Sequence, residues 1–347
     1  RRETACTVPG LNSQGGSAGS NPVGATRWNP LSEKLWQGVL ALPELARHIL
    51  VMPSASRNDR VLDQGVAGSR LSRTASGAAF CRLLEQGQPP GLRQFVDPVV
   101  GSLLDPLLAM MGSVSTQERV LDSLPPGTYG GMVMRTRYID DVVTAGVDGG
   151  IGQVVILGAG LDTRAYRLAS LAEATVFEAD LPEIQRLKRD RLRGRPCAAG
   201  ELRYVTVDFN TEPLDQALGA AGFDRSRPAV FVWEGVTQYL TEAAVRSTLG
   251  FVAGSARGSV LVFTYVLPSL VGDNSYAGWS GVLKQQLGTT EPWLFGLDPG
   301  SVPGFLDTFG LRILDDVGDA EYQERYLRPI GRQLRVNPGE RVALAAV

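Results

Sequence analysis

The sequence predicts an α/β fold in which an N-terminal helical cap precedes a doubly wound, Rossmann-like parallel sheet. Three observations predict it. Apolar residues between Val61 and Val147 recur largely at helical spacing. After Val147, short β-branched runs alternate with helical stretches, which is typical of parallel strands joined by right-handed crossovers. The apolar run Gln153–Leu157 leads directly into Gly158-Ala159-Gly160, the kind of turn that such sheets place beside a ligand.

The pattern divides the chain into three parts. Residues 1–60 are expected to be a disordered or weakly ordered leader, because residues 1–27 are rich in Gly, Ser, Asn and Pro and lack periodicity. Such a segment buries too little apolar surface to offset the entropy lost on ordering. Residues 61–148 are expected to form the helical cap, and residues 149–347 the sheet domain.

The cap and the sheet domain each contain a definite series of candidate elements. In the cap, helices are expected at Ala75–Leu84, Val99–Met111 and Met132–Val143. The sheet domain has five strand candidates, which are Gln153–Leu157, Thr175–Ala179, Arg203–Val207, Ala229–Trp233 and Ser259–Tyr265. The helices between and after them are expected at Arg164–Ala172, Leu181–Arg193, Leu214–Ala221 and Thr241–Ala256. Leu311–Asp315 and Tyr326–Val336 are expected to add a terminal antiparallel hairpin, with a turn near Gly331.

Composition excludes several classes of protein. A formal net charge of −2 over 347 residues gives no basic excess for nucleic acid or an anionic membrane. Cys6, Cys81 and Cys197 show no CxxC spacing, so neither a disulfide framework nor a zinc site is predicted. His48 is the single histidine, which excludes most His-dependent metal sites and Ser-His or Cys-His catalysis. We expect a cytoplasmic protein without a metal, a nucleic-acid partner or a membrane span; its oligomeric state is left open.

The glycine turn indicates a nucleotide-like ligand without saying which. Gly158 and Gly160 would let a ligand approach the backbone, where a Cβ would block it. A dinucleotide site needs GxGxxG, and Thr163 stands where the third glycine belongs. S-adenosylmethionine (SAM) carries no phosphate and needs only room beside the turn. A purely structural turn is equally compatible with these residues.

Acidic residues at two further strand ends support a nucleoside site. Asp180 ends the second strand about 20 residues after the glycines and could accept hydrogen bonds from both ribose hydroxyls, with Glu178 as the alternative. Asp208 and Phe209 end the third strand and could contact an adenine. A helix cap at Asp180, and a cap with a core aromatic at Asp208 and Phe209, are the structural alternatives.

Four segments in this order, MRTRYIDD, QVVILGAGLDTRAYRL, VFEAD and WEGVTQYLT, resemble the leucine carboxyl methyltransferase family. Within it they resemble a bacterial branch of SAM-dependent O-methyltransferases that includes polyketide carboxyl O-methyltransferases. The resemblance runs from about Ser72 to the C-terminus and implies a class I methyltransferase fold with SAM as cofactor. By this resemblance Arg135 contacts the SAM carboxylate and Glu234 lies near the methionine portion. The remaining cofactor-binding residues it implies are Gly158, Ala159, Gly160, Asp180, Asp208 and Phe209.

Methyl transfer from a sulfonium requires the enzyme chiefly to align the acceptor and exclude water. A carboxylate acceptor is already ionised at pH 7 and needs no base, whereas a phenol or alcohol would benefit from one. The scarcity of histidine therefore favours a carboxylate on a small molecule, such as a secondary metabolite. The candidate catalytic residues are Glu234, Tyr239 and Arg137.

Several neighbouring residues have two interpretations. Arg137 or Arg164 could pair with an anionic acceptor, or could form structural salt bridges with Asp140, Asp141 or Asp162. Glu234, Asp140 or Asp141 could act as a base for a hydroxyl acceptor. Tyr138 and Tyr265 are further candidate neighbours of the acceptor; Trp233, Trp279 and Trp293 are candidates for an apolar pocket, and Leu267–Gly300 for a lid.

Two other hypotheses stay open from the sequence. The first is an NAD-dependent oxidoreductase, which Thr163 and the lack of an obvious proton donor disfavour. The second is a protein of the SAM-binding fold that has lost catalysis and serves as a binding partner.

Overall fold

The computed structural model describes residues 70–106, 109, 121, 124, 126–272 and 293–347. The chain divides into two compact units, Arg1–Ala67 and Gly68–Val347, and every element below belongs to the second. The predicted leader, residues 1–60, lies outside the described residues, as does most of the predicted lid, Leu267–Gly300, including Trp279.

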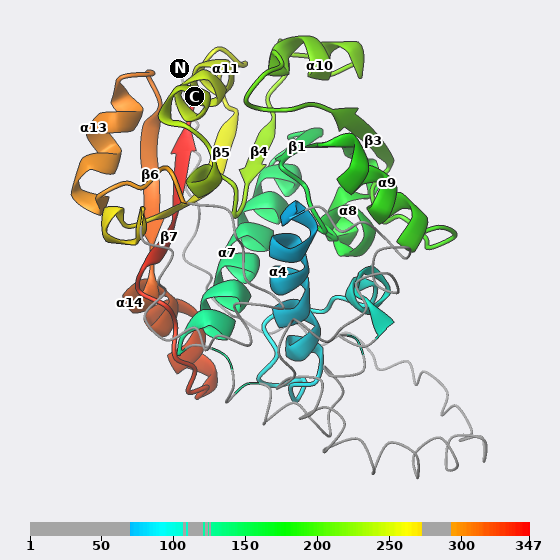
Figure 1. Ribbon diagram of the computed structural model, residues 1–347, viewed down its shortest axis with the longest axis vertical. Coiled ribbons are helices and arrows are strands. Elements are labelled where there is room, and N and C mark those ends of the chain that lie inside the picture. The colour runs from blue at the N-terminus through cyan, green and yellow to red at the C-terminus, as the bar shows by residue number, and fades with distance from the viewer. Residues whose placement is uncertain (1–69, 107–108, 110–120, 122–123, 125, 273–292) are drawn as a thin grey trace, which may run out of the picture. The chain divides into compact units, whose positions relative to one another are not determined.

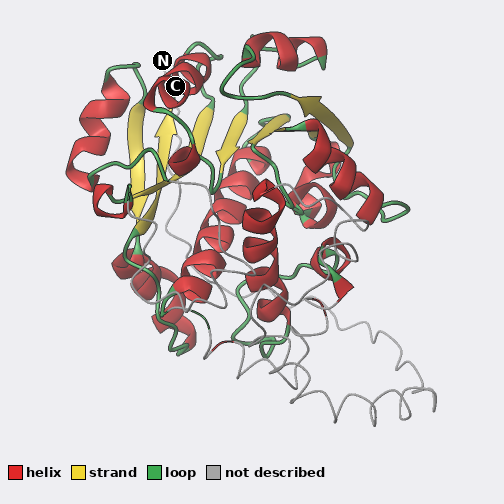
Figure 2. Cartoon of the chain, in the orientation of Figure 1, coloured by secondary structure: helices red, strands yellow, loops and turns green. Residues whose placement is uncertain are grey.

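A seven-stranded sheet with the strand order β3-β2-β1-β4-β5-β7-β6 runs through this unit (Figures 1 and 2). Five strands are parallel: β1 (Gln153–Leu157), β2 (Thr175–Asp180), β3 (Glu201–Thr206), β4 (Val230–Trp233) and β5 (Val260–Val266). β7 (Glu340–Ala346) is antiparallel to both β5 and β6 (Arg312–Val317). The strand order reverses at β1, which is where such a sheet opens a crevice at its carboxyl edge. The predicted doubly wound α/β fold is confirmed.

The central strands form where the sequence is continuously apolar. All five residues of β1 are buried, as are all four of β4, because helices cover both faces of the sheet. β3 lies at the edge and is partly exposed. Alternate residues of β1 belong to different cores: Val154 and Ile156 pack on one face, and Val155 and Leu157 on the other.

Helices follow the parallel strands in turn. α9 (Pro182–Arg191) follows β2, α10 (Leu214–Ala220) follows β3, and α11 (Glu242–Ala253) follows β4. Local signals place their starts: proline occupies the first turn of α9, and the Thr241 hydroxyl accepts the Ala244 N–H at the start of α11. After β1 the predicted helix Arg164–Ala172 is instead α8 (Arg164–Arg167) and a 3₁₀ turn (Ala169–Glu173), separated by the extended residue Leu168.

Two long helices, α4 (Arg70–Gln86) and α7 (Thr128–Asp148), pack against each other on one face of the sheet (Figure 1). They confirm two of the three predicted cap helices. The third, Val99–Met111, is interrupted in its described part: Val100–Leu103 form a 3₁₀ turn that ends at the extended residue Leu104, and the backbone is helical again at Pro106 and Ala109. Pro106 suits the start of a helix and disfavours helical backbone at Asp105, the residue before it.

The C-terminal region contains one further error of prediction. After α13 (Val302–Asp307), β6 and α14 (Asp319–Tyr322), residues Gln323–Leu327 form a π-helical turn and Arg328–Ile330 a 3₁₀ turn, where a strand over Tyr326–Val336 was predicted. Leu327 and Val336 are buried in the core that contains α4 and α7, so packing on the cap determines their conformation. The antiparallel hairpin exists, but its second strand is β7.

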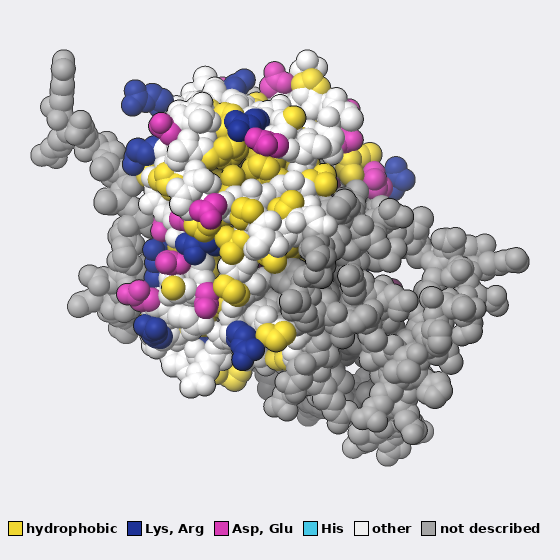
Figure 3. Space-filling model, turned by 60° about the vertical axis from the view of Figure 1, so that its left-hand side comes forward, with side chains coloured by type: hydrophobic (Ala, Val, Ile, Leu, Met, Phe, Trp, Pro, Cys, Tyr) yellow, Lys and Arg dark blue, Asp and Glu magenta, His cyan; other side chains and the backbone are white. Residues whose placement is uncertain are grey.

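The surface and the helices carry two further observations. Figure 3 shows the side of the molecule on which α13 lies. Acidic and basic side chains are interspersed there, and neither sign of charge forms a patch of its own. Among the described residues, no helix combines the length and the apolar character needed to cross a bilayer.

Candidate active site

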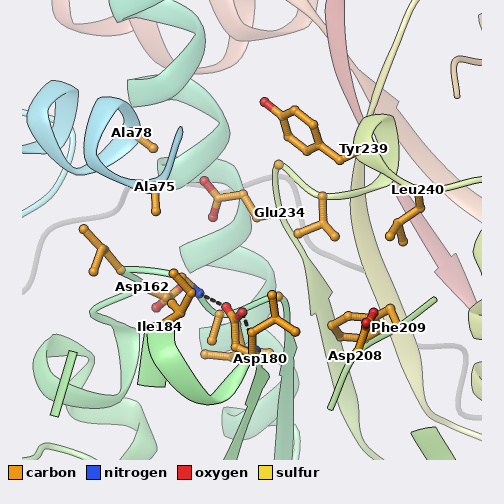
Figure 4. A pocket seen from close by; sticks show the side chains of 18 of the residues that line it. Ala75, Ala78, Asp162, Asp180, Ile184, Asp208, Phe209, Glu234, Tyr239 and Leu240 are labelled. Atoms are coloured by element: carbon orange, nitrogen blue, oxygen red, sulfur yellow. Dashed lines mark hydrogen bonds between the residues drawn. The ribbon is translucent and has the colours of Figure 1, made fainter. Parts of the chain in front are cut away.

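A cavity of about 510 Å³ lies at the carboxyl edge of the parallel strands. Its lining comes from the turn after β1, the ends of β2 and β3, the segment after β4, and helices α4 and α7 (Figure 4). We call its two parts the glycine-turn end, formed by Gly158, Gly160, Asp180, Asp208 and Phe209, and the arginine end, formed by Arg82, Arg135, Asp162 and Glu234.

At the glycine-turn end both glycines are structurally required. Gly158 has a φ of +67°, and a Cβ on it would lie 2.4 Å from a methyl carbon of Val236. Gly160 has a φ of +47°, and a Cβ there would lie 3.4 Å from the Ala75 Cβ on α4. The turn therefore passes between the segment after β4 and α4, where a larger residue would need both a strained backbone and extra room.

Asp180 lies beside this turn and holds it. Its Oδ2 accepts the Gly160 N–H at 2.5 Å, and its Oδ1 accepts the Leu181 N–H at 2.7 Å (Figure 4). Burial raises the pKa of Asp180, and the two backbone hydrogen bonds offset only part of that effect. The carboxylate thus both supports the turn and lines the cavity.

The other acidic candidates divide between the cavity and the interior. Asp208 and Phe209 line the cavity across from Asp180, and Asp208 Oδ1 accepts the Asn210 N–H at 2.9 Å (Figure 4). Glu178, the alternative to Asp180, does not line it. Its buried carboxylate pairs with Lys188 Nζ at 2.7 Å, and burial raises its pKa to about 7.

A chain of buried ion pairs connects β7 to α4 past the arginine end. We call it the ion-pair chain; the sign of the charge alternates from each member to the next. Its members in order, with the nitrogen–oxygen distance to the next, are Glu340 (2.6 Å), Arg135 (2.9 Å), Glu234 (2.7 Å), Arg164 (2.8 Å), Asp140 (2.6 Å), Arg167 (3.7 Å), Asp97 (3.2 Å) and Arg82. Asp162 joins it through Arg164.

Guanidinium groups lower the pKa of two carboxylates at the arginine end, Glu234 and Asp162, whereas burial raises the pKa of Glu340 despite its pair with Arg135. Burial by itself raises the pKa of Glu234, but Arg164 and Arg135 outweigh burial, so the net shift is downward. Burial also opposes ionisation of Asp162, and Arg164 with the other cations nevertheless lowers its pKa to about 2. Because Glu234 contacts two guanidinium groups and is held charged, it is a poor general base.

The three candidate catalytic residues have different surroundings. Glu234 and Tyr239 line the cavity, and the Tyr239 ring stands edge-on to Trp293 at 6.5 Å (Figure 4). Arg137 is not among the lining residues: its Nε pairs with Asp141 at 3.0 Å and its Nη1 donates to the Gln94 carbonyl. Arg135 and Arg137 are two residues apart on α7 and so face different sides of the helix.

The remaining candidates do not themselves line the cavity. Arg164 belongs to the ion-pair chain, so its salt-bridge interpretation holds. The Tyr138 and Tyr265 hydroxyls donate to Asp315 and Asp316. Trp233 is fully buried in the sheet core and does not line the cavity.

Sequence reasoning missed several contributors to the site, five of which bear on its geometry. Ala75, Ala78 and Arg82 lie on one face of α4 and line the cavity, at helical spacing that would have indicated a common face. Gly235, with a φ of +71°, lies beside Arg135. Glu340 begins a strand that was not predicted, so nothing local indicated its position.

Comparison with known proteins gives a consistent result. A family model described as leucine carboxyl methyltransferase matches residues 75–253. A protein from Mycolicibacterium gilvum named "Putative S-adenosyl-L-methionine-dependent methyltransferase" is 36% identical over 212 residues, 58% of this chain and 68% of the relative. A protein of the same name from Mycobacterium sp. (strain JLS) is 44% identical over 188 residues, 51% of this chain and 60% of its own length. A solved structure of a DUF574 family protein from Streptomyces avermitilis shares 17% identity at a TM-score of 0.45, covering 70% of this chain and 90% of that one.

Proposed function

The chain belongs to the leucine carboxyl methyltransferase family of SAM-dependent methyltransferases, and from that premise we propose that it methylates a carboxylate oxygen of a small molecule. The observation that carries the proposal is one cavity with two different ends. The glycine-turn end offers Asp180 to a ribose, and the arginine end offers Arg135 and Glu234 to an amino acid. A nucleoside joined to an amino acid is the chemistry of SAM.

The cavity suits SAM in size, shape and charge. Its volume of about 510 Å³ lies within the usual range for ligand pockets. A Cβ at Gly158 would clash with Val236, another lining residue, so the glycine allows this close approach at the cavity wall. The described lining carries four carboxylates, Asp162, Asp180, Asp208 and Glu234, and two guanidinium groups, Arg82 and Arg135. This excess of negative charge favours a ligand with a positively charged sulfonium.

In the proposed binding mode each residue has one role. Asp180 accepts the ribose hydroxyls, Asp208 and Phe209 contact the adenine, Arg135 pairs with the amino-acid carboxylate and Glu234 with the ammonium group. When bound, SAM supplies an electrophilic methyl group. The chain aligns the acceptor oxygen with that methyl group and excludes water, and Tyr239 is positioned in the lining to contact the acceptor.

One observation favours a carboxylate acceptor over a hydroxyl, and another disfavours NAD. Glu234, the lining residue expected as a base, is ion-paired with Arg135 and Arg164 and has a lowered pKa. An alcohol or phenol would need a base to take its proton, whereas a carboxylate attacks without one. Thr163, at the position of the third glycine of a dinucleotide site, is buried and donates to Asp97 at 2.6 Å, which disfavours NAD.

A labelled-methyl experiment tests the proposal. The full chain is incubated with methyl-labelled SAM and a cell extract, which is then separated into protein and small-molecule fractions. We expect label in the small-molecule fraction that mild base releases as volatile methanol, because methyl esters hydrolyse and methyl ethers do not. The matched control is Asp180→Ala, which should transfer far less label.

Each other outcome would contradict a defined part of the proposal. Base-stable label in the small-molecule fraction would contradict a carboxylate acceptor, since methyl groups on a hydroxyl oxygen, a nitrogen or a carbon all survive mild base. Label in the protein fraction would indicate a protein carboxylate. SAM binding without transfer to any acceptor would support a binding protein that has lost catalysis, and no SAM binding in calorimetry would overturn the proposal entirely.

A further inference from the structure

Glu340 brings a carboxylate to the site from the far end of the chain. It is the first residue of β7, where it pairs with Val266, the last residue of β5. Because β7 is antiparallel to β5, the start of β7 meets the carboxyl edge of the parallel strands. Glu340 does not line the cavity, yet it lies directly behind a residue that does.

That residue is Arg135, whose guanidinium is held by two carboxylates. Its Nε donates to Glu234 Oε1 at 2.9 Å and its Nη1 donates to Glu340 Oε1 at 2.6 Å. Across the ranges that the structure describes, its Nη2 makes no hydrogen bond, and this nitrogen lies beside Gly235. A Cβ on Gly235 would come within 3.1 Å of Nη2, so the glycine leaves the space next to that nitrogen open.

The two carboxylates that hold Arg135 are not equivalent. Glu234 also pairs with Arg164 at 2.7 Å and is therefore anchored without Arg135. Glu340 forms its ion pair with Arg135, and no second cation contacts it within the described residues. Its side chain is 10% exposed, so its charge is poorly solvated. Within the ion-pair chain Glu340 therefore contacts Arg135 alone, and any effect it has on the site passes through that residue.

We propose that Glu340 is a positioning residue that, through Arg135, prepares the arginine end for the amino-acid part of SAM; this rests on the proposed function. With Nε and Nη1 held, the guanidinium of Arg135, a lining residue of the cavity, keeps a single orientation with Nη2 beside Gly235. A ligand carboxylate then meets an arginine whose side-chain freedom has already been lost. Without Glu340 the Arg135 guanidinium would lose one of the two carboxylates that hold it in place.

The proposal predicts a ligand-selective defect, which calorimetry can measure. The probes are SAM, S-adenosylhomocysteine and 5′-methylthioadenosine, which keeps the adenosine and the sulfur but has no amino acid. For Glu340→Ala we expect about 10-fold weaker binding of SAM and S-adenosylhomocysteine, and unchanged binding of methylthioadenosine. The matched control is Glu321→Gln, whose carboxylate pairs with Arg341, the next residue on β7, outside the cavity.

A second variant covers the case in which Glu340→Ala fails to fold. Glu340→Gln keeps the shape and one hydrogen bond but removes the charge, and we expect about a 3-fold loss with the same selectivity. Equal weakening for all three probes would show a general structural role and overturn the proposal, as would wild-type affinity for all three. If the wild-type chain itself binds none of the probes, the proposed function fails and not merely this inference.

Discussion

The two ends of the cavity are built from residues at very different separations along the chain. At the glycine-turn end the contact that defines the site, Gly160 with Asp180, spans 20 residues. At the arginine end, Arg135 contacts residues 99 and 205 positions away. The glycine-turn end forms wherever β1 and the turn after it pair with β2, the next strand along the chain. The arginine end exists only when the helical cap, the strand β4 and the last strand come together.

The ends also differ in how they treat buried charge. Around the glycine-turn end burial dominates, so the pKa of Asp180 is raised and that of Glu178, two residues earlier on β2, rises to about 7. At the arginine end guanidinium groups dominate, and the pKa values of Glu234 and Asp162 are lowered. The two ends therefore satisfy their buried carboxylates differently: Asp180 accepts hydrogen bonds from backbone N–H groups, whereas Glu234 and Asp162 pair with guanidinium groups.

The largest expected loss of ligand affinity comes from breaking the glycine-turn end. Asp180→Ala removes an acceptor of two ribose hydrogen bonds, each worth about 1.5–3 kcal/mol when one partner is charged. We expect SAM, S-adenosylhomocysteine and methylthioadenosine all to bind about 100-fold more weakly in calorimetry, because all three contain the ribose. A loss confined to the two amino-acid ligands would contradict the assignment of this end to the nucleoside.

A somewhat smaller effect is expected at the arginine end. Arg135→Lys keeps the charge but loses the planar fork, so it cannot hold two carboxylates and a ligand at once. We expect about 30-fold weaker binding of SAM and S-adenosylhomocysteine and little change for methylthioadenosine, measured in the same titrations. Arg137→Lys, on another side of the same helix, is the control and should bind all three like the wild type. If it were impaired instead, the arginine end would be wrongly located.

A third expected effect is on stability rather than on ligand binding, and it contrasts Glu178 with Asp162 at the arginine end through their pH dependence. In the folded chain Glu178 has a pKa of about 7, against 4.5 as its ordinary value. Between these values the native state binds more protons than the unfolded state, so the free energy of unfolding should fall as pH rises from about 5 to 8. The contribution is on the order of 3 kcal/mol. Urea unfolding of Glu178→Gln should show a correspondingly weaker decline over this interval.

The control for that comparison is Glu173→Gln, whose side chain is exposed and which should keep the wild-type dependence. Asp162 at the arginine end contributes in the opposite direction. Its lowered pKa means that it stabilises the fold above its ordinary value of 3.8, and that this stability is lost as pH falls toward about 2. If the free energy of unfolding fell equally with pH in the wild type and in Glu178→Gln, the raised pKa assigned to Glu178 would be refuted.

The sequence by itself determined the parts of the molecule that depend on local pattern. The buried runs of β1 and β4, the glycine turn and Asp180 were all predicted, because continuous apolar runs, glycine turns and strand-end carboxylates are properties of neighbouring residues. The resemblance of four segments added the family and suggested Arg135, which does line the cavity.

Only the tertiary structure decided which charged groups meet. Sequence spacing could not say that Arg137 points away from the cavity while Arg135 faces it, or that Arg164 is enclosed by carboxylates. Nor could it place Glu340. The sequence pattern predicted the last strand at Tyr326–Val336, but the residues near Tyr326 form helical turns that pack on α4 and α7, and the strand begins only at Glu340. The physical reason is distance along the chain: an ion pair across 205 residues leaves no local pattern, since its partners are brought together by the core and not by their neighbours.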